Sequence, residues 1–199
     1  MRSNICKIEK GTRDLAAILK ESERVAEYNG LTQKQTLQLR LLCEEIDGML
    51  PNIIDDFDGE LWIDFEDGVC KINVYIQIPE LNTEKKEELI GIAKNRKNAA
   101  AVGIVGKIRN SIENFFLNEE RMDSFALSAG AFGLENEYYD GTDYTYLWRL
   151  AVYRGSVNRE EKKDDWDELE KSVIASVADD VIVGVKGKRA EVVIIKKFA

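Results

Sequence analysis

The sequence contains no histidine among its 199 residues. Ser–His and Cys–His nucleophilic pairs are therefore excluded, and so is the most common protein ligand of transition metals. Cysteine is also scarce, because only Cys6, Cys43 and Cys70 are present, each inside an apolar stretch and none in a CxxC spacing. We predict reduced thiols in the core and a reducing, cytoplasmic compartment, without a disulfide framework or a zinc site.

Long hydrophobic runs are absent as well. The first residues lack the apolar stretch of a signal peptide, and the longest run of small or apolar residues, 99–106, is too short to cross a bilayer. Acidic residues outnumber basic ones by 37 to 28, for a net charge of -9. Such a surface does not attract nucleic-acid phosphate or anionic lipid, so we expect a soluble protein with no nucleic-acid or membrane partner.

Hydrophobic residues make up 44% of the chain, which is enough to bury a core. Neither an internal repeat nor a linker interrupts the pattern, so we expect one domain over residues 1–199. Residues 4–9 favour a short strand, and a helix is predicted from Gly11 and Thr12 to Asn29-Gly30, where an Asn-Gly pair favours a helix end.

A second helix follows at once. Thr32 and Gln35 have the spacing of a capping box, apolar residues recur at helical intervals as far as position 53, and Pro51 bends or stops the last turn. The acidic residues 55–60 are predicted to form a turn. A calcium site there is a weaker alternative, because the spacing does not match an EF-hand loop.

Residues 60–78 predict a β-hairpin with a tight turn at Asp67-Gly68. The alternation places two sets of side chains on opposite faces: Leu61, Ile63, Phe65, Ile72, Val74, Ile76 and Ile78 on one, and Trp62, Asp64, Lys71, Asn73, Tyr75 and Gln77 on the other.

The second half of the chain is less regular. Residues 83–115 predict one or two helices, and residues 118–143 have no clear period. Residues 145–154 alternate as a strand, with Tyr146, Trp148, Leu150 and Val152 on one face. Tyr138, Tyr139 and Tyr144 extend this aromatic group, which is either a partner-binding surface or partly core.

The last segment predicts a helix within residues 160–177 and a hairpin that turns at 186–188. Its basic residues, Lys186, Lys188, Arg189, Lys196 and Lys197, are typical of a solvated edge strand. An edge at the end of the chain would also give an opportunity for a homodimer.

Two segments resemble one known family. The segment GLTQKQTLQLRLLCEEIDGMLPNII (30–54) resembles the second helix of the GHKL superfamily, which includes histidine-kinase ATPase domains and anti-sigma-factor serine kinases. ELEKSVIASVADDVIVGVKGKRAEVVIIKKF (168–198) is similar to the end of the same domain. The resemblance implies a Bergerat-like α/β fold, an α+β two-layer sandwich with a mixed, mostly antiparallel sheet covered by helices on one face, and an enlarged lid insertion at about residues 80–165.

The resemblance also implies roles for individual residues. Glu45 matches the family glutamate that activates water or an acceptor hydroxyl. The family asparagine that binds magnesium one turn later is replaced by Met49, whose thioether is a poor ligand for a hard cation. Asn52, on roughly the same helical face, or Asp47 is the substitute if magnesium binds at all. The neighbouring Glu44 is more simply explained as part of a solvated helix face.

The two other family motifs are altered. Where the family has an adenine-binding aspartate followed by glycines, this chain has IQIPELNT (76–83), with Gln77, Pro79 and Glu80. Where the family has a glycine-rich phosphate turn, it has WDELEKS (166–172), whose carboxylates repel polyphosphate. Gly103 and Gly106 are the remaining candidates for phosphate binding, as displaced lid glycines. The alternatives are a KH-type GxxG loop and close helix packing.

We therefore expect a degenerate anti-sigma-factor-like regulatory protein that binds a sigma-factor-like or other regulatory protein, needs no cofactor or metal, and does not turn over ATP. The alternative is an active ATP-dependent serine kinase or ATPase, with Glu45 as base and ATP and magnesium as cofactors. A third reading is a small-molecule pocket in the vacated nucleotide cavity.

Overall fold

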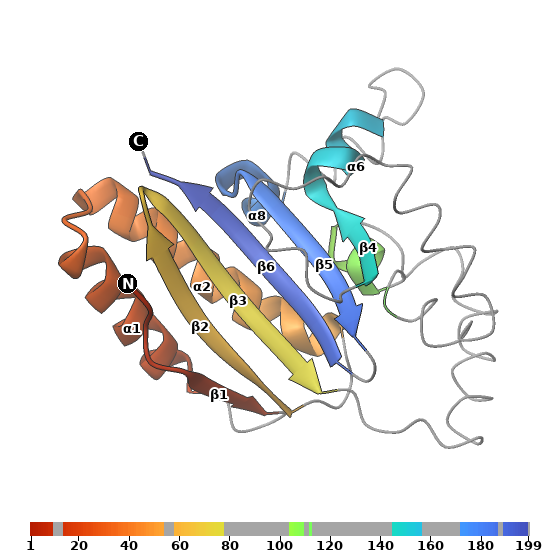
Figure 1. Cartoon of the computed structure of the whole chain (residues 1–199), viewed down its shortest axis with the longest axis horizontal. Helices are drawn as coiled ribbons and strands as arrows, with labels where there is room; N and C mark the ends of the chain where they lie inside the picture. The colour runs from red at the N-terminus through yellow and green to blue at the C-terminus, as the bar shows by residue number, and fades with distance from the viewer. Residues whose placement is uncertain are drawn as a thin grey trace.

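A computed structural model of the chain describes residues 1–9, 14–53, 58–77, 104–109, 112, 145–156, 172–186 and 189–198. Most of the expected insertion at 80–165 lies outside these ranges, and so do residues 55–57 of the predicted acidic turn. Figure 1 shows one sheet with its main helices behind it, which confirms the α+β two-layer fold expected from the sequence.

Within the described residues, the sheet has six strands in the order β1-β2-β3-β6-β5-β4, and every neighbouring pair is antiparallel. The described sheet is therefore wholly antiparallel rather than mixed. The strands are β1 (Cys6–Glu9), β2 (Asp58–Glu66), β3 (Val69–Gln77), β4 (Thr145–Arg149), β5 (Asp180–Lys186) and β6 (Arg189–Lys197).

The two long helices follow β1 and have the termini that their capping residues dictate. Helix α1 (Leu15–Tyr28) starts after Asp14, whose carboxylate accepts the Ala17 N–H at 3.0 Å. Gly11 and Thr12, from which the sequence predicted the helix, lie outside the described residues. The helix ends at Asn29, followed by Gly30 at φ 64°.

The capping box predicted for helix α2 (Gln33–Ile53) is confirmed. The Thr32 N–H donates to the Gln35 side-chain oxygen at 2.9 Å, and the Gln35 N–H donates to the Thr32 hydroxyl at 3.4 Å. Pro51 lies inside the last turn and does not end the helix before Ile53.

The hairpin of β2 and β3 is confirmed with its turn. Asp67 and Gly68 both have positive φ, 49° and 77°, which is the type I′ geometry that matches strand twist. Strand β2 begins at Asp58, so part of the predicted acidic turn is strand. Gly59 is required here, because a Cβ would lie 2.2 Å from the carbonyl oxygen of Tyr75 on β3.

The edge strand β1 is fastened to α1 by one carboxylate. Glu21 accepts the Asn4 N–H at 2.9 Å and the Asn4 amide at 3.0 Å, and it also accepts Arg24 Nη2 at 2.6 Å. Burial of Glu21 raises its pKa, but the hydrogen bonds from Asn4 and Arg24 lower it by more, so the net pKa is below the ordinary value.

The predicted strand over 145–154 was wrong in its second half. Strand β4 stops at Arg149, and Leu150–Ser156 form helix α6. Asp180 of β5 explains the switch, because its carboxylate accepts Arg149 Nε at 2.5 Å and the Ala151 N–H at 3.1 Å. It thereby caps the first turn of the helix from a neighbouring strand.

The position of the last strand differs from the prediction. The closing hairpin of β5 and β6 is confirmed, but β6 lies between β3 and β5 and pairs with both. It is therefore a central strand rather than a solvated edge, and it has no free edge for a dimer contact. Among the described strands, β1 and β4 are the outermost.

The main core lies between the sheet and the helices. The inner side chains of β2 and β3 are those that the alternation predicted, and they pack with α1, α2 and α8 (Val173–Val177). Residues 104–109 are helical and contribute Ile104 and Ile108 to the core, as the periodicity of the 83–115 segment predicts. A smaller cluster on the other face of the sheet contains Ile182, Val193 and Ile195.

The cysteines are free, as predicted. Cys43 and Cys70 are buried and Cys6 is half-buried. Burial raises the pKa of the Cys70 thiol to about 12 and that of Cys43 well above its ordinary value, so both remain protonated and unreactive. In the described ranges, no helix is both long enough and apolar enough to cross a membrane.

Candidate functional site

Glu45 lies on the flank of α2 that is turned away from α1. Helix α1 contacts α2 through Arg40, whose Nη1 lies 2.6 Å from the Glu23 carboxylate. Glu45 is five residues further along, about 140° around the helix axis. Its side chain is half-buried and forms no hydrogen bond or ion pair with another described residue. It is thus the predicted site residue with the most chemical freedom.

The position one turn after Glu45 belongs to the hydrophobic core. Met49 is 6% exposed and lies in the same buried cluster as Ile46 and Leu50. A side chain at this position points into the apolar layer beneath α2. Met49 therefore offers no oxygen to a magnesium ion, and its place in the core also limits access of a hydrated cation.

Asn52 shares the helical face of Glu45 but is separated from it. Seven residues of α-helix correspond to a rise of about 10.5 Å. The Asn52 amide donates to the Gly48 carbonyl at 3.3 Å, and Arg109 donates to the Asn52 carbonyl at 3.4 Å. The neighbouring guanidinium disfavours a second cation at this point.

Asp47 and Glu44 lie elsewhere on the helix. Asp47 is 7% exposed and is two residues beyond Glu45, about 160° around the axis, so the two carboxylates do not face one site. Glu44 pairs with Arg40 at 3.2 Å, an i, i+4 ion pair on the solvated face. This matches the solvated-face interpretation of Glu44.

The glycine candidates are only partly described. Gly106 is buried within the helical residues 104–109, between the core residues Ile104 and Ile108. This placement corresponds to close packing of a helix rather than to a phosphate loop. Gly103 lies outside the described residues, and so do Pro79, Glu80 and the acidic run 164–170.

The predicted aromatic surface is also mostly outside the described ranges. Trp148 is the member whose side chain is described, and it is half-buried, with its ring centroid 5.8 Å from that of Tyr153. Among the described residues, no group of three or more acidic or cysteine side chains could hold a metal ion.

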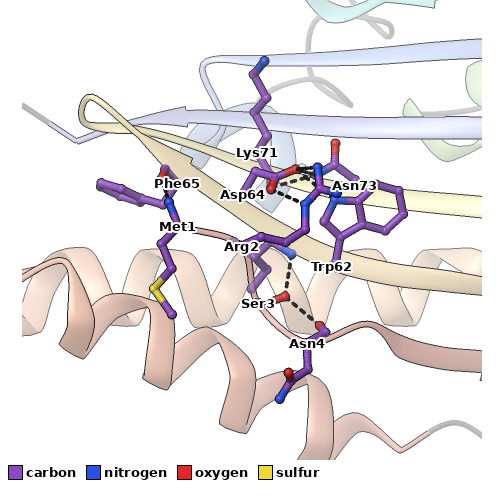
Figure 2. A network of polar contacts seen from close by, with 10 residues as sticks. Met1, Arg2, Ser3, Asn4, Trp62, Asp64, Phe65, Lys71 and Asn73 are labelled. Carbon is purple, nitrogen blue, oxygen red and sulfur yellow. Dashed lines mark hydrogen bonds and ion pairs between the residues drawn. The ribbon is translucent and has the colours of Figure 1, made fainter.

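A second set of polar residues gathers on the sheet face opposite the helices (Figure 2). Asp64 accepts Arg2 Nε at 2.7 Å, the Trp62 indole N–H at 2.9 Å and the Asn73 amide at 3.1 Å. The Arg2 guanidinium also lies 5.6 Å from the Trp62 ring centroid. Asp64 therefore fixes the orientation of the Trp62 ring.

The fixed tryptophan supports the floor of a hollow. The ring centroids of Trp62 and Tyr75 are 4.9 Å apart. Tyr75 in turn lines a hollow of about 360 Å³, which we call the β2–β3–β6 hollow. Its lining consists of Asp58, Gly59, Glu60, Tyr75, Ile76, Gln77 and Arg189.

Part of this hollow could be predicted from the sequence. The alternation in residues 60–78 placed Trp62, Asp64 and Tyr75 on one face, as observed. It did not place Arg2 or Arg189 there, because these residues reach the same face only through pairings between distant segments.

Comparison of the chain with protein-family models, with curated proteins and with solved structures finds no match.

Proposed function

We propose that this chain is a regulatory protein of the anti-sigma-factor kind, which acts by binding another protein and does not turn over ATP. The order of elements supports the proposal: a strand, two helices and a hairpin, followed late in the chain by a helix and a closing hairpin. This order is the one that the resemblance to the GHKL superfamily implies.

The observation that carries the proposal is the environment of Met49. In the GHKL superfamily, which the sequence resembles, an asparagine at this position holds magnesium. Here the side chain of Met49 is part of the apolar core. Magnesium requires hard oxygen ligands in octahedral geometry, and it normally accompanies a bound nucleoside triphosphate. Without an oxygen ligand at position 49, helix α2 does not hold the magnesium ion that would activate the γ-phosphate for hydrolysis or transfer.

The competing function is an ATP-dependent serine kinase or ATPase. Glu45 favours it, because its carboxylate has no partner among the described residues and is available as a base. Arg109, which belongs to the helical residues 104–109 and donates to the Asn52 carbonyl near the end of α2, is the kind of cation that pairs with phosphate. A protein that keeps this fold but no longer binds a nucleotide would retain both residues. Their presence therefore does not require catalytic activity.

A titration with a fluorescent ATP analogue and magnesium distinguishes the two functions. We expect no saturable binding with a Kd below about 100 μM, a free energy of roughly -5.5 kcal/mol. Saturable binding that is lost in Glu45→Ala or Asn52→Ala would refute the proposal. Glu27→Ala is the matched control, because Glu27 is an exposed acid on α1 without a described side-chain partner.

A further inference from the structure

The β2–β3–β6 hollow has opposite charges on opposite walls. Asp58 and Glu60 project from β2, and Arg189 projects from β6, with β3 between them. Neighbouring strands are about 4.8 Å apart, so the two walls arise from backbones roughly 10 Å apart. The acidic wall and the basic wall are therefore separated by the width of a small molecule.

The charged groups on the two walls do not neutralise one another. Arg189 Nε donates to the Gln77 side-chain oxygen at 3.3 Å, which holds the guanidinium over β3 and leaves its terminal nitrogens available. Neither Asp58 nor Glu60 forms a side-chain hydrogen bond or ion pair with a described residue. Lys7, opposite Glu60 on β1, forms no ion pair with it either.

The floor between the walls is rigid. Tyr75 leans on Trp62, and Trp62 is held by Asp64 and Arg2. Gly59 cannot acquire a side chain without meeting the Tyr75 carbonyl, which fixes the spacing of β2 and β3 beside the hollow. A preorganised floor lowers the entropic cost of binding a ligand.

From this arrangement we infer that the β2–β3–β6 hollow binds a small zwitterion, either a free amino acid or a dipeptide. The ammonium group of the ligand lies against Asp58 and Glu60, and its carboxylate pairs with the guanidinium of Arg189. The aromatic face of Tyr75 contacts the carbon skeleton or the ammonium group. The volume of about 360 Å³ is at the lower end of the range for ligand pockets, which fits a ligand of this size.

This site is independent of the proposed function. The hollow is on the sheet face opposite α1 and α2, whereas the argument about ATP concerns the flank of α2. Loss of either conclusion leaves the other unchanged.

The test is a calorimetric titration of the full chain with a panel of the common free amino acids and with glycylglycine. Ethylamine and acetate are the probes that carry a single charge. We expect saturable binding of at least one zwitterion with a Kd of about 1 mM or tighter, and no saturable binding of ethylamine or acetate. Comparison of the affinities for free amino acids and for glycylglycine shows whether the ligand is an amino acid or a dipeptide.

Three variants locate the binding. Arg189→Gln and Glu60→Gln should each weaken the affinity at least tenfold. Glu66→Gln is the matched control, because Glu66 is exposed on the same face of β2 but does not line the hollow, and its affinity should equal that of the wild type. Absence of saturable binding across the panel, equal binding of the single-charge probes, or unchanged affinity in Arg189→Gln and Glu60→Gln would each overturn the inference.

Discussion

The side chain of Met49 packs in the hydrophobic core and does not offer a ligand to a metal ion. The sequence alone identified Met49 as a poor magnesium ligand from the chemistry of its thioether. It did not show that the position is buried next to Ile46 and Leu50. The structure thus adds a second obstacle, because an asparagine here, as in the superfamily that the sequence resembles, would place an amide in an apolar layer.

We therefore predict that Met49→Asn destabilises the protein without conferring nucleotide binding. The loss of apolar contacts and the burial of an amide should cost about 2–5 kcal/mol of unfolding free energy. Met49→Leu, which keeps the volume nearly constant, should cost less than about 1.5 kcal/mol. Urea denaturation followed by circular dichroism measures both. A stable Met49→Asn variant that binds Mg-ATP would show that the site is intact apart from this ligand.

Two glycines give a paired test at the same scale. Gly59→Ala brings a Cβ within 2.2 Å of the Tyr75 carbonyl, so strands β2 and β3 must separate, at a cost of about 1–3 kcal/mol. Gly48→Ala, in an exposed helix position where an added Cβ would meet no atom outside the neighbouring helix backbone within 4 Å, should stabilise the protein by about 0.5–1 kcal/mol. Thermal melts give the order of stability. Equal effects of the two substitutions would contradict the strand spacing described here.

At the scale of helices and strands, the sequence correctly predicted the features that depend on interactions between residues close together in the chain. The capping box of α2 and the turn at Asp67-Gly68 depend on residues within four positions of one another, and both are confirmed. The switch from β4 to α6 depends on Asp180, 29 residues beyond Ala151, and the alternation of residues 145–154 gave no indication of it. Helix α1 likewise starts at a local cap, Asp14, three positions before the Ala17 N–H that it accepts.

The junction of β1 and α1 gives a prediction about pH. The pKa of Glu21 is lower in the folded state than its ordinary value of 4.5, so its stabilising contribution is complete above pH 4.5 and is lost as the pH falls through the folded pKa. Glu21→Gln should therefore cost about 1–3 kcal/mol at neutral pH, and the difference from the wild type should shrink in acid.

Chemical denaturation at neutral pH and at a series of acidic pH values tests this expectation. Glu27→Gln, on the exposed face of the same helix, is the control and should change stability little at any pH. A wild-type advantage over Glu21→Gln that grows as the pH falls would contradict the assigned direction of the shift.

For the whole molecule, the main difference from the sequence-based expectation is the place of the last strand. β6 pairs with β3 across more than a hundred residues of chain, for example Gln77 with Arg189. Sequence periodicity identifies a strand but not its neighbours, so the basic residues of β6 were interpreted as signs of an edge. The same limitation hid the hollow, whose walls come from β2 and β6.

A central β6 implies that the fold depends on it. We predict that a chain ending at Lys186 lacks a cooperative thermal transition, because β3 and β5 both lose their partner. Removal of residues 1–9, which include the edge strand β1 (Cys6–Glu9) paired on one side, should leave a cooperative transition at lower temperature. Circular dichroism melts compare the two truncations. A cooperative transition in the first one would contradict the central position of β6.

The central claim, that the chain acts through a protein partner and not through ATP, is tested most directly by affinity purification of the tagged chain from its source cells, with and without added Mg-ATP. We predict one partner protein in near-stoichiometric yield, equal in the two preparations and carrying no transferred phosphate. A partner that is phosphorylated in the presence of Mg-ATP, a partner that binds only when ATP is added, or recovery of the chain with no partner would contradict it.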